Sequence, residues 1–328
     1  MKLVELLDGC AAYAPEFGHG LSNHLPMTLV ALHRLGATDA RLEAFAARYA
    51  VRLEPAPPAE PWPAGAAWPP RLGQLQAWPA YRSLFAEWVD QEGAIDVLGQ
   101  VLPQLVQGAG AAAFHGLIRT AYAARGGHRA ELADALAYWA CRHLRLGPMD
   151  NPQAGTEAEP STDDPVRLLR ELKACASPAA LIFERMRDAS LDGQVNRVAA
   201  RLYVDAGTLQ RLARAAAFAY ARSGNFVALH LVTGTHAMRV LSNFFDEPLT
   251  ACAWFWQAYA HAVAAAGLQS APAAGRLLPW SAIVERAVAS DDEHVIKLVD
   301  SCREEEKAYA RRGETLWREA ATRALEGP

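Results

Sequence analysis

The chain has 328 residues, of which 52% are hydrophobic and 21% are charged, a balance typical of a globular protein with a large core. Its formal net charge of -4 gives no electrostatic case for nucleic-acid binding, which calls for a basic patch or stripe. No stretch reaches about 18 uninterrupted apolar residues, and the first residues lack the apolar run of a secretory signal. The five cysteines are widely spaced and form no CxxC pair, as expected of reduced thiols. We therefore expect a cytoplasmic protein without a membrane span.

Helical periodicity dominates the chain. Apolar residues recur at helical spacing, together with Ala, Leu, Glu and Arg, in segments that we predict to be helices. These segments are residues 38–50, 93–107, 110–125, 129–146, 164–175, 178–187, 193–202, 205–222, 226–245, 249–267, 279–290 and 291–312. A further helix is expected to begin near His24 and run to Leu35. Strand-like alternation is scarce, so the prediction is an all-α fold, as one large domain or as two packed helical halves.

Two segments interrupt the helical pattern. Residues 54–80 are rich in proline and tryptophan, a composition that disfavours helix and predicts an extended arm packed by its indoles. Residues 147–163 are polar and rich in turn-forming residues, as in a solvated linker. The expected organisation is an N-terminal half over 1–146, this linker, and a C-terminal half over 164–328. A ligand site shared by the two halves would lie between them.

Histidines in apolar segments are the most informative residues of this chain. His24, His115, His230, His236 and His294 all have apolar neighbours, and a buried imidazole needs a hydrogen-bonding partner or a metal. Imidazole is a good ligand for zinc, copper, iron and nickel, so the set indicates a metal site assembled by the fold. The alternative is that these are core histidines bonded to backbone carbonyls.

The spacing of His230 and His236 poses a geometric question. Six residues at about 100° each place the two rings about 120° apart on a straight helix. Either the helix is distorted at Thr233 and Gly234, or only one of the two rings faces the site.

Lys297 follows His294 by three residues, so the two side chains share one helix face. Burial would lower the pKa of this lysine, and its neutral amine would then react with carbon dioxide to give a carbamate, an anionic oxygen ligand. Taken alone, Lys297 is more simply a lysine whose ammonium reaches solvent.

Other residues have both a functional and a structural interpretation. An aromatic group would form stacking walls for a flat polycycle or, more simply, pack between helices. Arg119 and Arg239 would bind a substrate oxygen or, more simply, form interhelical salt bridges. The members of the aromatic group are Trp254, Phe255, Trp256, Tyr259, Phe244 and Phe245.

Six segments, in the same order along the chain, carry a family signal: NHLPM at 23–27, ALHRLGA at 31–37, AFHGLIR at 113–119, ADALAYW at 133–139, LHLVTGTHA at 229–237 and DEHVIKL at 292–298. Together they resemble the questin oxidase-like family, whose fungal members open the rings of anthraquinones and related polyketides oxidatively. The resemblance implies a non-haem iron centre held by four histidines and a carboxylated lysine. Carried over by position, it makes His24, His115, His230, His236 and Lys297 the ligands, with His294 beside them or as a substitute.

The resulting prediction is an oxidoreductase, a mono- or dioxygenase that uses Fe(II) and O2 to oxidise or cleave a phenolic or quinoid polycyclic aromatic. It includes a carbamate formed by CO2 on Lys297 and NADPH as a reductant. Its partners would be a small aromatic substrate and O2, with no nucleic acid and no membrane.

Three alternatives remain open. The first is an NADPH- or flavin-dependent Baeyer–Villiger-type enzyme, although no GxGxxG follows a predicted strand. The second is a non-catalytic helical binding protein, and the third is a zinc or manganese hydrolase.

Overall fold

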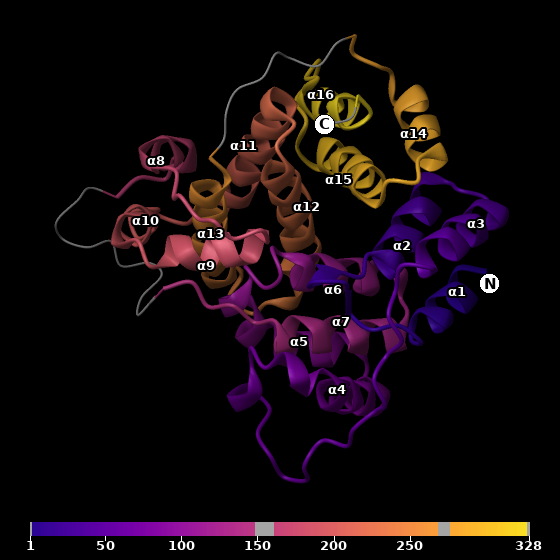
Figure 1. Ribbon diagram of the computed structural model, residues 1–328. Helices are drawn as coiled ribbons and strands as arrows, with labels where there is room; N and C mark the ends of the chain where they lie inside the picture. The colour runs from indigo at the N-terminus through magenta and orange to yellow at the C-terminus, as the bar shows by residue number, and fades with distance from the viewer. Residues whose placement is uncertain (1, 148–160, 268–275, 327–328) are drawn as a thin grey trace.

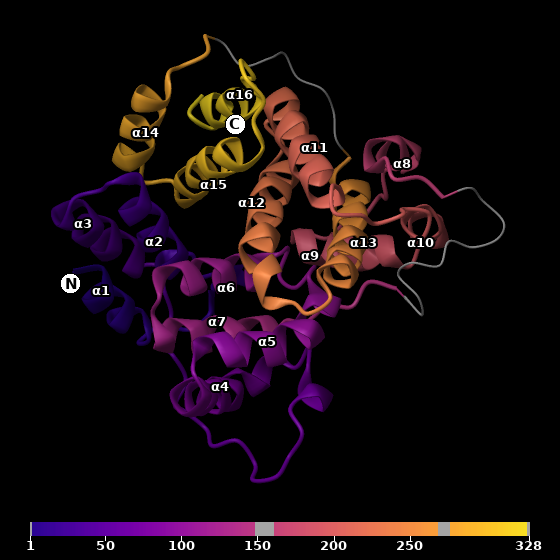
Figure 2. The ribbon, with the colours of Figure 1, turned by 180° about the vertical axis from the view of Figure 1, so that it is seen from behind.

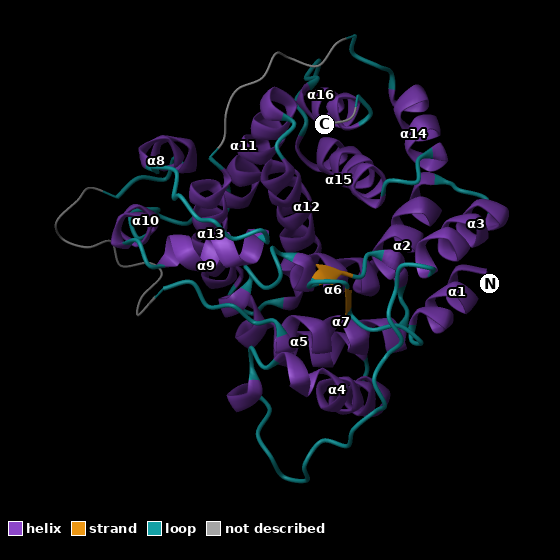
Figure 3. Cartoon of the chain, viewed as in Figure 1, coloured by secondary structure: helices purple, strands orange, loops and turns teal. Residues whose placement is uncertain are grey.

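The computed structural model describes residues 2–147, 161–267 and 276–326. These ranges form α-helices and one short hairpin, which confirms the all-α prediction (Figure 3). The α-helices are α1 (Lys2–Cys10), α2 (Leu25–Leu35), α3 (Asp39–Ala50), α4 (Trp78–Glu92), α5 (Ala94–Leu105), α6 (His115–Gly126), α7 (Arg129–Cys141), α8 (Pro165–Glu171), α9 (Ile182–Ser190), α10 (Gly193–Ala199), α11 (Thr208–Ser223), α12 (Phe226–Leu241), α13 (Pro248–Ala266), α14 (Trp280–Ala289), α15 (Glu293–Tyr309) and α16 (Leu316–Ala324). Short 3₁₀ helices are η1 (Pro69–Arg71), η2 (Leu75–Ala77), η3 (Val106–Gly108) and η4 (Ser242–Phe244).

The hairpin precedes α2. Its strands are β1 (Glu16–Phe17) and β2 (Leu21–Ser22), paired antiparallel with Glu16 opposite Ser22 and Phe17 opposite Leu21.

Helices from the two ends of the chain pack together. α2 contacts α15 and α14, and α6 contacts α12 as well as α2 and α7. Figure 1 shows α2 and α3 next to α14 and α15, and Figure 2 shows the same neighbours from behind. A continuous hydrophobic core includes buried residues from both predicted halves, so the two sets of helices meet along α2, α6, α12 and α15. Residues 148–160, most of the predicted linker, lie outside the described residues.

α6 lies unusually close to α7 at a glycine. A Cβ placed on Gly116 would lie 2.8 Å from the Cα of Trp139, so only glycine allows this approach. The Trp139 indole donates to the carbonyl oxygen of Gly108 at 3.1 Å. The close approach at Gly116 holds the start of α6 against α7, and the Trp139 hydrogen bond holds η3 there as well.

The proline- and tryptophan-rich segment differs in part from the prediction. Residues 54–68 contain no helix, but η1, η2 and the start of α4 at Trp78 fall within the range predicted to be extended. The physical reason is that Pro79 occupies the first turn of α4, where its missing N–H has no partner to lose. The predicted indole packing is present: ring centroids lie 4.9 Å apart for Trp62 and Tyr81.

Among the described residues, no helix has both the length and the apolar character that a membrane crossing requires.

Candidate metal centre

Four histidines meet where four helices begin. His24 immediately precedes α2, His115 opens α6, His294 lies in the first turn of α15, and His230 lies one turn into α12. Ring centroids are 4.6 Å apart for His24 and His115, 4.7 Å for His24 and His294, and 4.9 Å for His115 and His230. One ligand nitrogen each from His24, His115 and His294 lies within 4.8 Å of the others. The two predicted halves therefore both contribute to this histidine cluster.

A left-handed turn delivers His115 to the cluster. Ala112, Ala113 and Phe114 have φ angles of 46°, 57° and 70°, a region that residues with a Cβ enter at a cost of about 1–2 kcal/mol each. The predicted helix over 110–125 therefore begins only at His115. Such strain is retained where the surrounding structure requires a particular geometry.

Gly234 makes room for this turn rather than distorting α12. A Cβ on Gly234 would lie 3.3 Å from Cγ of Phe114, so its absence lets the phenyl ring pack on the helix. α12 is α-helical throughout Phe226–Leu241. His230 and His236 consequently point in different directions.

His236 lies apart from the histidine cluster. Its Nδ1 is 2.7 Å from Oε1 of Glu305, and its Nε2 is 3.2 Å from Nη1 of Arg125. Arg239 donates to the same Glu305 oxygen at 2.7 Å. Of the residues singled out from the sequence, the structure brings together His24, His115, His230, His294 and Lys297.

Two rings of the cluster have a defined tautomer. Nδ1 of His230 donates to the carbonyl oxygen of Phe226 at 2.7 Å, and Nδ1 of His115 donates to that of Ala112. Because a carbonyl oxygen only accepts, both Nδ1 atoms carry the proton and both Nε2 atoms present a lone pair. Metal-ligating histidines are held in this way.

One nitrogen of His24 lacks a hydrogen-bond partner. Its Nε2 is 2.8 Å from Nε2 of His115, while its buried Nδ1 has no hydrogen-bond partner. Oε1 of Glu293 lies 3.7 Å from this Nδ1. In His294, Nδ1 lies 3.5 Å from Oδ1 of Asp292. A carboxylate therefore lies near Nδ1 in both His24 and His294.

Burial keeps the cluster neutral. It lowers the pKa of His24 and His115 well below the usual value, that of His230 to about 3, and that of His294 in the same direction. The positive charge of nearby Lys297 acts in the same sense on all four rings. Neutral imidazole is the form that binds a metal.

Lys297 is buried beside the histidines, one turn after His294 on α15, as the shared-face prediction requires. Burial lowers its pKa to about 8, although Glu293 and Asp292 raise it. Within the described part of the chain, no hydrogen bond or ion pair holds its ammonium. Tyr122 donates instead to the backbone carbonyl of Lys297, at 3.3 Å.

A cavity of about 280 Å³ opens onto the four histidines. Phe17, Phe183 and Phe226 contribute aromatic rings to its lining, and Arg52 and Arg185 contribute charge. Phe226 makes edge contacts with both His230 and His294. The cavity therefore combines apolar walls with a nitrogen-rich floor.

The aromatic group singled out from the sequence does not line this cavity. Trp254, Phe255, Trp256 and Tyr259 are buried on α13; the Trp256 indole donates to the carbonyl oxygen of Ala199 on α10, and the Tyr259 hydroxyl to that of Leu212 on α11. Interhelical packing, the simpler interpretation, accounts for these contacts, and Tyr259 also lines the second cavity described next.

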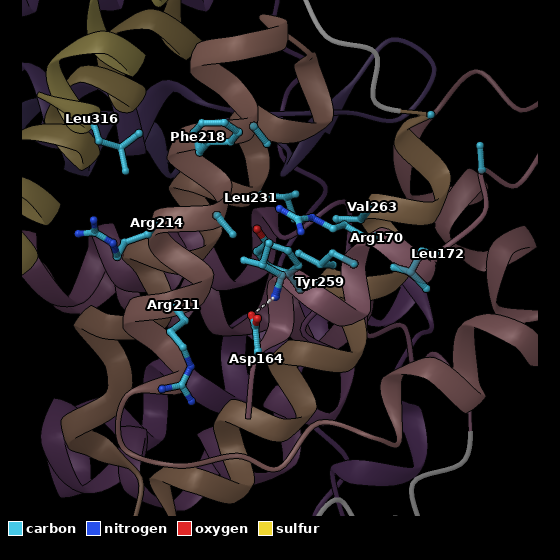
Figure 4. Close-up of a pocket in the computed structure, with 16 residues that line it drawn as sticks. Asp164, Arg170, Leu172, Arg211, Arg214, Phe218, Leu231, Tyr259, Val263 and Leu316 are labelled. Carbon is cyan, nitrogen blue, oxygen red and sulfur yellow. Dashed lines mark hydrogen bonds between the residues drawn. The ribbon is translucent and has the colours of Figure 1, made fainter. Parts of the chain in front are cut away.

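A larger cavity, of about 880 Å³, lies between α8, α11 and α13. Figure 4 shows Tyr259, Leu231 and Phe218 in its walls, with Arg170 and Arg214 also among the lining residues. None of the described residues lining it is a histidine. Size alone therefore does not identify the chemical site, and the smaller cavity carries the candidate centre.

The two arginines discussed from the sequence form salt bridges between helices. Arg119 on α6 donates to Glu131 on α7 at 2.6 and 2.8 Å, and Arg239 on α12 donates to Glu305 on α15. These pairs confirm the simpler prediction.

A family model described as questin oxidase-like matches residues 21–302. The match runs from β2 into α15 and includes the whole histidine cluster and Lys297. No curated protein matches the chain. The family implies an oxidoreductase acting on a small molecule, with anthraquinones as the suggested substrate class. The chain thus belongs to the questin oxidase-like family.

Proposed function

We propose that this protein is an iron-dependent oxygenase that uses O2 to oxidise or cleave a phenolic or quinoid polycyclic aromatic of the anthraquinone class. The observation that carries the proposal is the cluster of four neutral histidines at the floor of a cavity of about 280 Å³. Family membership supplies the reaction class, and the donor set supplies the metal chemistry.

The residues fit a bound metal ion. Without one, Nε2 of His24 must donate to Nε2 of His115, since His115 carries its proton on Nδ1, and Nδ1 of His24 is then left bare in a buried site. With both Nε2 lone pairs on a cation, Nδ1 of His24 carries the proton, and the Glu293 carboxylate 3.7 Å away lies near that N–H group. A bound ion would thus allow Nδ1 of His24 to be protonated instead of leaving it as a buried lone pair without a partner.

His24, His115, His230 and His294 would hold the ion. In this proposal His294 takes the place that the resemblance gives to His236, because His236 is bonded to Glu305. Ferrous iron bound there would supply the electrons and the open coordination position that O2 chemistry requires.

Lys297 would supply an anionic oxygen as a carbamate. Its neutral amine nitrogen forms a bond to the carbon of CO2, and the proton released passes to solvent water. Carbamate formation replaces the lysine cation by an anion. This anion would lie near the histidine cluster, to which α2, α6, α12 and α15 each contribute a residue at or near their N-terminal ends. The partial positive charge of helix N-termini stabilises an anion at such a point.

The remaining cavity residues would bind and orient the substrate. Phe17, Phe183 and Phe226 offer ring faces and edges to a flat polycycle, and their apolar surface limits access of water. The negative charge of Glu293, 3.7 Å from Nδ1 of His24, would favour the His24 tautomer that carries its proton on Nδ1.

The test is elemental analysis of protein purified without an affinity tag, together with His24→Ala and His115→Ala. We expect about one iron per chain in the parent protein and a loss of iron in both variants. His33→Ala is the matched control, because His33 lies on α2 but is exposed. A folded parent protein that carries zinc or no metal, or folded variants that retain iron, would refute the proposal.

A further inference from the structure

The two arginines that line the histidine cavity differ in how their charge is balanced. Nη2 of Arg52 lies 3.4 Å from Oε2 of Glu293, and its guanidinium stacks 3.9 Å over the ring of Tyr49. Nε of Arg185 is buried and has no hydrogen-bond partner among the described residues. No hydrogen bond or ion pair among the described residues holds the rest of this side chain, so its guanidinium remains available to a partner from outside the chain.

Arg185 is one of the residues that line the histidine cavity. Arg185 lies on α9, which packs on α13, and it lines the cavity together with Leu181, Ile182 and Phe183. The same lining includes the four histidines and, from the left-handed turn before His115, Ala112 and Ala113. A ligand in this cavity can therefore contact the histidine floor and the arginine at the same time.

The charge of the cavity lining favours an anion. Arg52 and Glu293 offset each other, which leaves the positive charge of Arg185 uncompensated. The converging helix N-termini act in the same sense. A guanidinium binds carboxylate and phenolate oxygens through directed, charge-assisted hydrogen bonds.

We propose that Arg185 binds an ionised oxygen, a carboxylate or a phenolate, carried by the aromatic substrate, and thereby sets the orientation of that substrate over the histidine cluster. The inference rests on the proposed function in placing an aromatic substrate in this cavity. It adds that the preferred substrate is an anion and names the residue that selects it.

The experiment is equilibrium binding of three probes to the full chain as purified. The probes are anthraquinone-2-carboxylate, 2-hydroxyanthraquinone as its phenolate, and the uncharged anthraquinone-2-carboxamide. We expect one or both anions to bind about 10-fold or more tightly than the carboxamide. The carboxylate and phenolate arms identify which oxygen is selected.

Variants assign the preference to the arginine. Arg185→Met should abolish the preference while leaving carboxamide binding unchanged, and Arg185→Lys should retain part of it. Arg187→Met is the matched control, because Arg187 lies on the same helix but its side chain is 59% exposed and pairs with Asp188. This variant should bind all three probes like the parent protein.

Three results would overturn the inference: no binding of either anion, equal weakening of all three probes by Arg185→Met, or a preference that survives Arg185→Met and disappears on chelation. In the last case the metal, not the arginine, binds the anion. None of these results affects the iron analysis, so failure of this inference and failure of the proposed function are distinguishable.

Discussion

Replacing either His236 or His294 by leucine separates the two arrangements that the sequence leaves open. His294 lies within the histidine cluster, 4.7 Å from His24 between ring centroids, whereas His236 is bonded to Glu305. We expect His294→Leu to lose iron and His236→Leu to retain it. The free energy of unfolding should instead fall more in His236→Leu than in His294→Leu.

The magnitudes follow from the contacts that each leucine removes. The His236 and Glu305 side chains are 2% and 1% exposed, and Arg239 remains as a partner of Glu305. A hydrogen bond to a charged group contributes about 1.5–3 kcal/mol, so His236→Leu should destabilise the metal-free protein by about 2 kcal/mol. The His294 ring is 20% exposed and lies 3.5 Å from Asp292, which predicts a loss below about 1 kcal/mol.

Iron content and denaturant unfolding provide the two readouts. Unfolding is measured after chelation, because a bound metal would itself raise the stability of the parent protein. If His236→Leu loses iron as completely as His294→Leu while remaining folded, the assignment of the fourth histidine to His294 is refuted.

Two further predictions concern the left-handed turn and the lysine. Ala113→Gly should relieve about 1–2 kcal/mol of backbone strain. It also removes a buried methyl group, which costs about 0.8 kcal/mol, and it raises the entropy of the unfolded chain. Because these effects oppose each other, the free energy of unfolding should change little. The matched change Ala135→Gly, in the buried interior of α7, should cost about 2 kcal/mol in the same denaturation assay, and equal losses would contradict strain at Ala113. Lys297→Ala should lower the iron content, with partial recovery on adding acetate as a substitute oxygen ligand. Lys307→Ala, an exposed position on the same helix, should leave the iron content unchanged, and a Lys297→Ala protein with full iron would rule out the carbamate ligand.

Local sequence patterns predicted most of the helices because apolar periodicity and capping residues act over a few neighbouring positions. No helix was predicted at α1, at α16 or over most of α4. In two other places a non-local contact or a position within a helix overrode the local pattern. The segment before His115 has a helical composition, yet its left-handed turn depends on packing of Phe114 against Gly234. Proline suggested an extended chain up to residue 80, but Pro79 is compatible with the first turn of α4.

The sequence by itself determined the all-α class, the histidine-bearing segments and the shared face of His294 and Lys297, since each depends on residue type or on spacing within one helix. The spacing of His230 and His236 also predicted that their rings lie about 120° apart on a straight helix, so that both could not face one site. Only the tertiary structure decided which ring joins the cluster. That choice depends on Glu305 and Arg125, which lie 69 and 111 positions away along the chain and bond to His236. Arg185 gave no sequence signal, because its place in the cavity lining without an acidic partner depends on the fold and not on its neighbours in the chain.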